Sequence, residues 1–152
     1  MSVMSKAYEM YSAWSKGTVL YTRWADMNHI GYPELMILYT LISGTHLTQK
    51  KITEEIGLVK ATVNTVIRDL KKRGLVTLTA SQNDKRRKDV ALTDEGKIYA
   101  EEIIRPLLEM EDRITRMIGN GRMEQTVATM ELFNMLFEKE LKQRIESEKQ
   151  NL

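Results

Sequence analysis

The chain has 152 residues, of which 42% are hydrophobic and 29% charged, and a formal net charge of +2. This length suits one folding unit with its own core, and the composition argues against disorder as the main state. Cysteine is absent, which excludes disulfides, thiolate-bound zinc and a cysteine nucleophile. Only two prolines and eight glycines occur, so residue preferences favour helix.

The N-terminal segment, residues 1–16, carries Glu9 and several polar residues where a secretory signal needs an unbroken apolar stretch. The longest mainly apolar run, residues 35–42, is far shorter than the roughly 20 residues that span a bilayer. We therefore expect a cytoplasmic protein.

The net charge hides an uneven distribution. Residues 47–90 hold eleven Lys or Arg against five Asp or Glu, a surplus of +6, whereas the rest of the chain sums to −4. A basic centre between acidic arms is expected of a segment that faces a polyanion such as nucleic acid. A charged, solvated helix surface would give the same count, so charge alone leaves both interpretations open.

In chain order, the first predicted element is a helix over residues 3–27, where apolar residues recur at helical intervals. Pro33 suits the first turn of a second helix, residues 34–43. Thr48 is placed to cap a short third helix through residue 56, because its hydroxyl can accept a bond from a free backbone N–H.

The fourth predicted helix, residues 60–72, lies between turns at Gly57 and Gly74. Its apolar residues share one face: Val63, Val66, Ile67 and Leu70. Small and hydrogen-bonding residues share the other: Ala61, Asn64, Thr65 and Arg68. Helical periodicity therefore predicts that one face packs on the core while the other is free to contact a partner.

Beyond this helix the periodicity changes to that of strands, at residues 75–79 and again at residues 89–92. The polar residues between them predict a β-hairpin with four consecutive cations at residues 85–88. Thr93 is then placed to cap another helix.

That helix is predicted over residues 94–118, and Pro106 should kink it or remove one of its hydrogen bonds. Residues 119–121 break the chain before a last helix over residues 123–145, and residues 146–152 should fray. The apolar residues predicted to face inward are Val127, Met130, Phe133, Leu136, Phe137 and Leu141. We therefore predict a mainly α fold with a small β-hairpin wing.

A short helix, a tight turn, a helix with a polar outer face and a basic hairpin, in this order, form the winged helix-turn-helix arrangement. A helix fits the major groove of B-form DNA, where Asn can bond adenine and Arg can bond guanine. Phosphate is favoured near a helix start. The candidate DNA-binding residues here are Lys60, Ala61, Thr62, Asn64, Thr65 and Arg68. Each alone is compatible with an ordinary exposed position, but their shared face favours DNA.

Arg86 and Arg87 at the hairpin tip have two interpretations: solvated turn charges, or groups that enter the minor groove, whose negative potential attracts arginine. We favour the groove because a turn does not need four cations in a row. Asp84 is placed to orient one guanidinium, and Lys85 completes the candidate set at the tip.

The run NDKRRKDVALTDEG, residues 83–96, resembles the wing signature of the multiple-antibiotic-resistance regulator (MarR) family. Upstream, residues 70–76 resemble the exit of that family's recognition helix, and residues 47–49 its helix-turn-helix entry. These motifs cover residues 47–96, while the order and lengths of the predicted helices agree over essentially the whole chain.

The resemblance implies a homodimer with intertwined terminal helices, two lobes on a pseudo-palindromic operator, Arg86 in the minor groove and often an effector pocket. We accordingly expect a single unit over residues 1–152, with a winged helix-turn-helix lobe at 32–96 and dimerisation helices at 1–30 and 97–147. The expected function is that of a sequence-specific duplex-DNA-binding transcriptional regulator, a repressor relieved by a small-molecule ligand.

Three positions depart from the family's usual pattern. Ala61 and Thr65 stand where the family often has a hydroxyl residue and an arginine, so the base sequence read is expected to differ from the commonest one. Lys51 replaces a frequent acidic residue and adds to the attraction for phosphate. The cysteine of the family's peroxide sensors is absent, which excludes thiol-based sensing.

The apolar residues of the terminal helices give an independent argument for a homodimer. Two long arms at the ends of a small domain cannot easily bury all their aromatic side chains within one chain, so a partner is expected to cover them. These side chains include Tyr8, Tyr11, Trp14, Phe133 and Phe137.

The first quarter of the chain is rich in aromatic residues and Met, which indicates either core or a pocket for a small aromatic or apolar effector. Arg23 is placed to hold a carboxylate of such a ligand. The candidate ligand-binding residues are Tyr11, Trp14, Arg23, Trp24, His29 and Tyr39.

Metal, cofactor and enzyme functions find little support. His29 and His46 are the only histidines and have no companion cluster, so we expect no zinc site. The sequence has no glycine-rich phosphate loop, no HExxH and no nucleophile elbow, so we expect no enzyme and no cofactor. Two rival interpretations remain: a helical ligand-binding or protein-interaction module without DNA binding, and a winged helix that binds RNA.

Overall fold

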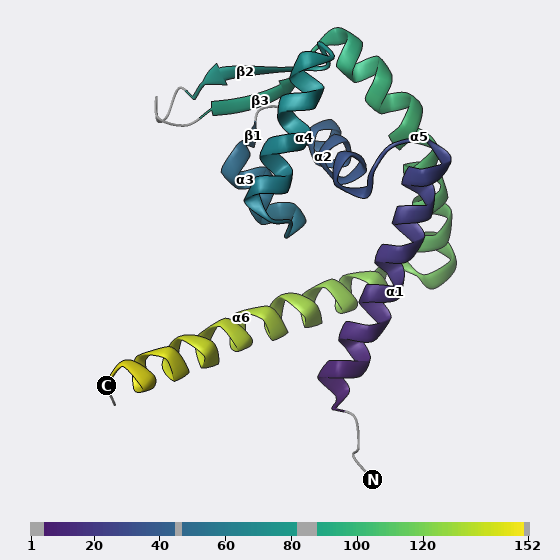
Figure 1. The fold of residues 1–152 in the computed structure, drawn as a ribbon. Helices are drawn as coiled ribbons and strands as arrows, with labels where there is room; N and C mark the ends of the chain where they lie inside the picture. Colours follow the sequence, from purple (N-terminus) through teal and green to yellow (C-terminus); the bar gives the residue numbers. More distant parts are fainter. Residues whose placement is uncertain (1–4, 45–46, 82–87, 151–152) are drawn as a thin grey trace. The chain divides into compact units, whose positions relative to one another are not determined.

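The computed structural model describes residues 5–44, 47–81 and 88–150, which form six helices and three short strands (Figure 1). In chain order these are α1 (Lys6–Met27), α2 (Tyr32–Ser43), β1 (Leu47–Thr48), α3 (Gln49–Ile56), α4 (Lys60–Lys72), β2 (Val76–Ala80), β3 (Lys88–Leu92), α5 (Asp94–Ile118) and α6 (Asn120–Gln150). The chain divides into two compact units, Met1–Leu107 and Leu108–Leu152, so the boundary falls inside α5. None of the helices in the described part of the chain has both the length and the hydropathy of a membrane span.

Local hydrogen bonds explain where the first helices begin. The hydroxyl of Ser5 accepts a bond from the backbone N–H of Tyr8 at 3.2 Å, at the start of α1. The hydroxyl of Thr48 accepts one from the N–H of Lys51 at 3.1 Å, which confirms the predicted cap of α3. Pro33 lies in the first turn of α2, as predicted. Backbone N–H groups in the first turn have no partner within the helix, so the lack of an N–H at Pro33 costs no helical hydrogen bond.

The strands form one antiparallel sheet in the order β1-β3-β2. β2 and β3 are the predicted hairpin, with Val76 opposite Leu92. β1 was not predicted and adds a third strand by pairing Leu47 with Val90. Its two residues are too few to show the alternation by which a strand is recognised in a sequence. The predicted mainly helical fold with a small wing is confirmed.

The core of the first unit lies among α2, α3, α4, the sheet and the first half of α5. Its largest fully buried side chains include Leu35, Leu38, Ile52, Val63, Ile67, Leu70, Val90 and Ile104. Burying one such side chain stabilises the fold by roughly 1.5 to 3 kcal/mol. Three of these residues belong to α4, so the core fixes which face of that helix points outward. Val66, predicted on the packed face, is half-buried.

α5 begins against the turn that follows α4. The hydroxyl of Thr93 accepts a bond from the N–H of Gly96 at 2.9 Å, as the predicted cap requires, and donates one to the carbonyl of Gly74 at 2.7 Å. A Cβ at position 96 would collide with the carbonyl oxygen of Leu75, so only glycine permits this approach. The helix then continues through Pro106 as a single element.

α6 is longer than the sequence predicted. It begins at Asn120, directly after Gly119, whose φ of 100° suits glycine. It continues to Gln150, whereas a helix over residues 123–145 and a frayed end were predicted. The prediction was therefore wrong at both ends. At the C-terminal end the apolar periodicity stops at about residue 145, but the polar residues beyond it are mostly good helix formers. At the N-terminal end, Asn120 and Gly121 were predicted to break the chain and are instead the first residues of the helix.

The apolar side chains of α6 are not buried within the chain, although they were predicted to face inward. Of residues 108–149, none is buried. The exposed ones include Val127, Leu132, Phe133, Met135, Leu136, Phe137, Leu141 and Ile145. Helical periodicity placed these residues on a face but did not supply the surface that would cover it.

Candidate nucleic-acid interface

α3 and α4 are joined by a tight turn over residues 57–59. Gly57 has φ 63°, a left-handed conformation that favours glycine, and it ends α3. Val59 then occupies the N-cap position of α4, where its side chain makes no capping bond and is 71% exposed. The turn therefore leaves the first residues of α4 at the surface.

α4 has one buried and one exposed face, as predicted. Val63, Ile67 and Leu70 are fully buried, whereas Ala61, Thr65 and Arg68 are exposed. The hydroxyl of Thr65 donates a bond to the carbonyl of Ala61 at 3.0 Å and accepts one from Nη2 of Arg68 at 3.5 Å. Because its single proton is used within the helix, Thr65 can offer only acceptor capacity outward.

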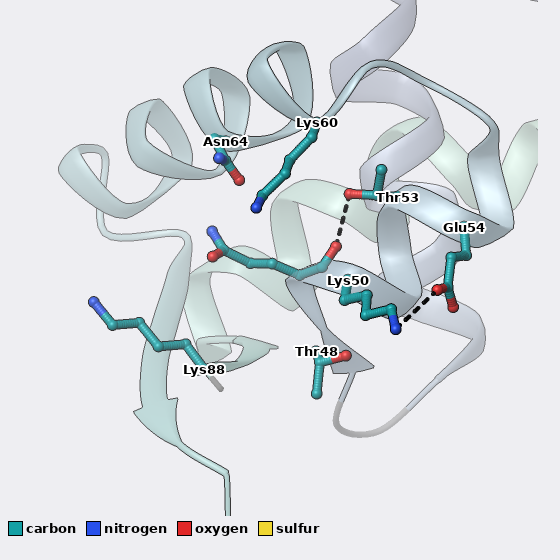
Figure 2. A pocket seen from close by; sticks show the side chains of 8 residues that line it. Thr48, Lys50, Thr53, Glu54, Lys60, Asn64 and Lys88 are labelled. Atoms are coloured by element: carbon teal, nitrogen blue, oxygen red, sulfur yellow. Dashed lines mark hydrogen bonds and ion pairs between the residues drawn. The ribbon is translucent and has the colours of Figure 1, made fainter. Parts of the chain in front are cut away.

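A hollow of about 680 Å³ lies beside α4 (Figure 2). Its lining consists of Thr48, Gln49, Lys50, Thr53, Glu54, Lys60, Asn64 and Lys88. The three lysines belong to α3, α4 and β3 respectively. The single carboxylate among these lining residues, that of Glu54, lies 3.6 Å from Nζ of Lys50. The lining is therefore polar with a net positive charge, which suits phosphate groups.

Figure 2 shows how the lining side chains are oriented. Lys60 and Asn64 extend from α4 toward the hollow, and Lys88 extends from its strand at another edge. Lys50 turns instead toward Glu54. The hydroxyl of Thr53 donates to the carbonyl of Gln49 at 2.8 Å and so makes its bond within α3.

The candidate residues on α4 thus fall into two groups. Lys60 and Asn64 line the hollow, whereas Ala61, Thr65 and Arg68 lie on the exposed stripe. Thr62 is half-buried. The four candidates at the hairpin tip, Asp84, Lys85, Arg86 and Arg87, lie outside the described residues.

Six lining residues were absent from the predicted site: Thr48, Gln49, Lys50, Thr53, Glu54 and Lys88. The charge surplus of residues 47–90 included both lysines but carried no information about their position. They approach α4 because β1 pairs with β3, with Thr48 opposite Asp89. This pairing brings the start of α3 beside the start of β3. Because β1 was not predicted, the sequence did not indicate that these residues lie beside α4.

The candidate ligand-binding residues are dispersed. Tyr39 lines a hollow of about 380 Å³ together with Met36, Thr40, Ser43, Gly44, Leu47, Glu55 and Ile56. The other five candidates are not part of this lining. Tyr11 and Trp14 are exposed, as are Arg23 and His29. Trp24 is half-buried, and its indole N–H donates to the carbonyl of Ile103 at 3.2 Å.

Metal binding has no support in the described part of the chain. No three His, Cys, Asp or Glu side chains gather there in a way that could hold a metal ion.

Comparison with known proteins agrees with this geometry. Residues 29–87 match the model of the MarR family. Over 95 residues the chain is 27% identical to the organic hydroperoxide resistance transcriptional regulator of Bacillus subtilis, and the match spans 62% of this chain and 65% of that relative.

Solved structures extend the likeness to nearly the full chain. NMB1585, a MarR family regulator from Neisseria meningitidis, is 25% identical, with a TM-score of 0.81 over 93% of this chain and 99% of that one. MepR of S. aureus, solved in complex with DNA, shares the fold at 22% identity, with a TM-score of 0.63 over 90% of this chain and 99% of that one. Residues 29–87 thus match the MarR family, and nearly the whole chain has the fold of a winged helix-turn-helix transcriptional regulator of that family.

Proposed function

We propose that the protein regulates transcription by binding duplex DNA in a sequence-dependent way as a homodimer. The observation that supports this most directly is the meeting of two surfaces on α4. One is the exposed stripe of Ala61, Thr65 and Arg68, and the other is the hollow lined by three lysines. Base edges are read by side chains of the first kind, and phosphates are held by those of the second.

The stripe has a definite chemistry. Arg68 can donate two bonds to O6 and N7 of guanine. Thr65 has spent its proton on the carbonyl of Ala61, so its oxygen suits the amino group of adenine or cytosine. The methyl group of Ala61 suits the methyl group of thymine.

In this proposal the lysines bind the phosphate backbone of the DNA. Lys60 lies at the first position of α4, where backbone N–H groups also favour phosphate. Lys50 and Lys88 add charge from α3 and β3. At the hairpin tip, we propose that Arg86 and Arg87, with Asp84 and Lys85, enter the adjacent minor groove.

The homodimer is supported by exposed apolar side chains on helices at both ends of the chain. On α1 these are Tyr8, Tyr11, Trp14, Val19 and Leu20, and on α6 they include Phe133 and Phe137. So many large apolar groups exposed on each of these helices indicate an interface. Two-fold symmetry would present two copies of α4 to major grooves about 10 base pairs apart.

We also propose that a small aromatic or apolar effector relieves repression. Support comes from α1, where Tyr11 and Trp14 are exposed and the exposed Arg23 carries a positive charge that can pair with a carboxylate. Thermal unfolding with a panel of aromatic carboxylates tests this. Stabilisation that is lost in Arg23→Ala supports the effector site, and the absence of any shift contradicts it.

The DNA proposal is tested by selecting bound duplexes from a random library and titrating the enriched duplex with salt. We expect an inverted repeat and a steep salt dependence, since each neutralised phosphate contributes about 0.9 to the slope. Lys60→Ala should reduce the slope by about 1 without changing the sequence selected. Arg68→Ala should cost about 1 to 3 kcal/mol and relax one base position in each half-site.

Two further variants complete the design. Arg86→Ala tests the minor-groove contact and should weaken binding strongly. Arg144→Ala removes an exposed arginine from α6 and serves as the matched control, with no expected change. If the wild type enriches no duplex and its weak binding is insensitive to salt, the DNA proposal fails. Preference for single-stranded RNA over duplex DNA would indicate the RNA-binding alternative.

A further inference from the structure

Glu34, Arg73 and Tyr99 form a polar cluster where three helices of the first unit meet. Nη1 of Arg73, at the end of α4, donates to Oε1 of Glu34 on α2 at 2.9 Å. The hydroxyl of Tyr99 on α5 donates to the same Glu34 oxygen at 2.9 Å. The guanidinium carbon of Arg73 also lies 5.1 Å from the centre of the Tyr99 ring, within cation–π range. One carboxylate thus joins α2, α4 and α5.

This cluster differs from an ordinary surface ion pair. Pairs such as Lys50 with Glu54 join exposed residues four apart on one helix, and such pairs add little stability. The Glu34 side chain is only 13% exposed, and its two donors lie 39 and 65 residues away in the chain. A carboxylate partly removed from water depends on its donors, so separating these helices is unfavourable.

The same end of α4 is held to α5 a second time, by two bonds from Thr93 to backbone carbonyls. The N–H of Thr93 donates to the carbonyl of Leu75 at 3.0 Å, and the Thr93 hydroxyl donates to the carbonyl of Gly74. Gly96 allows α5 to approach Leu75 more closely than any other residue would. The exit of α4 and the first turns of α5 therefore form one joint, to which Glu34 and Tyr99 add further side-chain contacts.

We propose that Glu34 and Tyr99 are positioning residues that act through Arg73 to hold α4 at a fixed angle to α5. This proposal rests on the proposed DNA-binding function. α5 continues past Leu107 into the second unit. If the two lobes of a homodimer bind two half-sites, the angle between α4 and α5 in each lobe affects the distance between the two copies of α4. Loosening the cluster should then weaken the preference for one half-site spacing, an effect that a loss of stability alone would not produce.

Two variants test the cluster with little change of shape. Tyr99→Phe removes the hydroxyl and keeps the ring beside Arg73. Glu34→Gln keeps an oxygen acceptor and removes the charge. Asp69→Asn is the matched control, because Asp69 is the other carboxylate bonded to Arg73 but lies on the same helix, four residues away. Lobe folding is checked by thermal unfolding, and binding is measured where all variants are folded.

The probe is the duplex that the wild type enriches from a random library, together with versions that have one base pair inserted or deleted at its centre. We expect Tyr99→Phe and Glu34→Gln to bind the enriched duplex about fivefold more weakly, the equivalent of one net hydrogen bond. The ratio of affinities between the enriched and respaced duplexes should fall by roughly threefold or more. Asp69→Asn should keep both values within about twofold of the wild type.

A double variant, Tyr99→Phe with Glu34→Gln, should lose no more than the weaker-binding single variant, because both changes act through one carboxylate. If the spacing ratio stays at the wild-type value in variants that fold, the positioning proposal is wrong while the DNA-binding proposal stands. If the wild type enriches no duplex, both proposals fail. Should Glu34→Gln not fold, Tyr99→Phe alone decides the result, since it removes a single oxygen atom.

Discussion

The two units of this chain treat their apolar side chains in opposite ways. In the first, the buried hydrophobic residues lie between Ala25 and Leu107 and form a core around α2 and α4. In the second, no residue from 108 to 149 is buried, even though Phe133 and Phe137 stack with their ring centres 6.0 Å apart. The first unit thus contains the apolar contacts that hold its helices together, whereas the apolar side chains of the second unit are not buried within the chain.

This difference explains why α4 is well defined within a single chain and α6 is not stabilised in the same way. A helix of this kind gains most of its stability from packing an apolar face, and little from residue preference alone. The 31 residues of α6 therefore need a surface that the second unit does not provide. A second copy of the chain, as proposed above, would supply it.

The largest expected effect comes from the core of the first unit. Ile67→Ala should destabilise the fold by about 2 to 5 kcal/mol, because Ile67 is fully buried in α4 and the change leaves a cavity. Urea unfolding measures the loss, and DNA binding should disappear with it. Thr65→Ala on the exposed face of the same helix is the control and should change stability by less than about 0.5 kcal/mol. Equal effects of both variants would contradict the two-faced description of α4.

The second unit should respond through association. Phe137→Asp places a charge on an apolar side chain that is 60% exposed in the single chain. If a second copy covers it, the dimer should lose on the order of 2 kcal/mol per copy, and its dissociation constant should rise by several hundredfold. Analytical ultracentrifugation over a dilution series measures this change.

Gln143→Asp introduces the same change of charge into α6 at a polar, exposed position and is the matched control. It should leave the dissociation constant nearly unchanged. A wild type that remains monomeric at high concentration would overturn the explanation given for α6, while leaving the description of the first unit intact.

The contrast between the units also shows what could be predicted from the sequence. Short-range signals were reliable: the Thr48 cap, Pro33 in a first turn and the glycines around α4 all identified helix boundaries. Helical periodicity also identified the buried face of α4, because this face packs into a core that lies in the same unit.

Features that depend on contacts between residues far apart in the chain could not be predicted from the sequence. β1 is a strand because it pairs with β3, and its two residues carry no pattern of their own. Lys50 and Lys88 were therefore missed as lining residues, although their charges had been counted. The cluster of Glu34, Arg73 and Tyr99 was missed for the same reason, since its members lie far apart in the chain and no local periodicity links them.

A substitution that stabilises the first unit also tests the comparison between the two units. Val59 occupies the N-cap of α4 without a capping bond. Val59→Ser should stabilise the first unit by about 1 kcal/mol, because the new hydroxyl can accept a bond from a free N–H of the first turn. Val59→Ala, which removes the same methyl groups without adding an acceptor, should give no gain. The effect should persist at every protein concentration, unlike that of Phe137→Asp.

The smallest effect concerns pH. Burial and the bond to Glu34 raise the pKa of the Tyr99 phenol above its ordinary value, although Arg73 partly opposes them. The folded state therefore holds this proton more tightly than the unfolded state, whose tyrosines titrate near pH 10. The corresponding stability is fully present below about pH 10 and is lost as the pH rises through the folded pKa. The urea midpoints of the wild type and Tyr99→Phe should thus differ at pH 8 and converge at alkaline pH, while other titrating groups affect both proteins equally. A difference that stays constant from pH 8 to pH 11 would mean that the Tyr99 proton does not contribute to holding the three helices together.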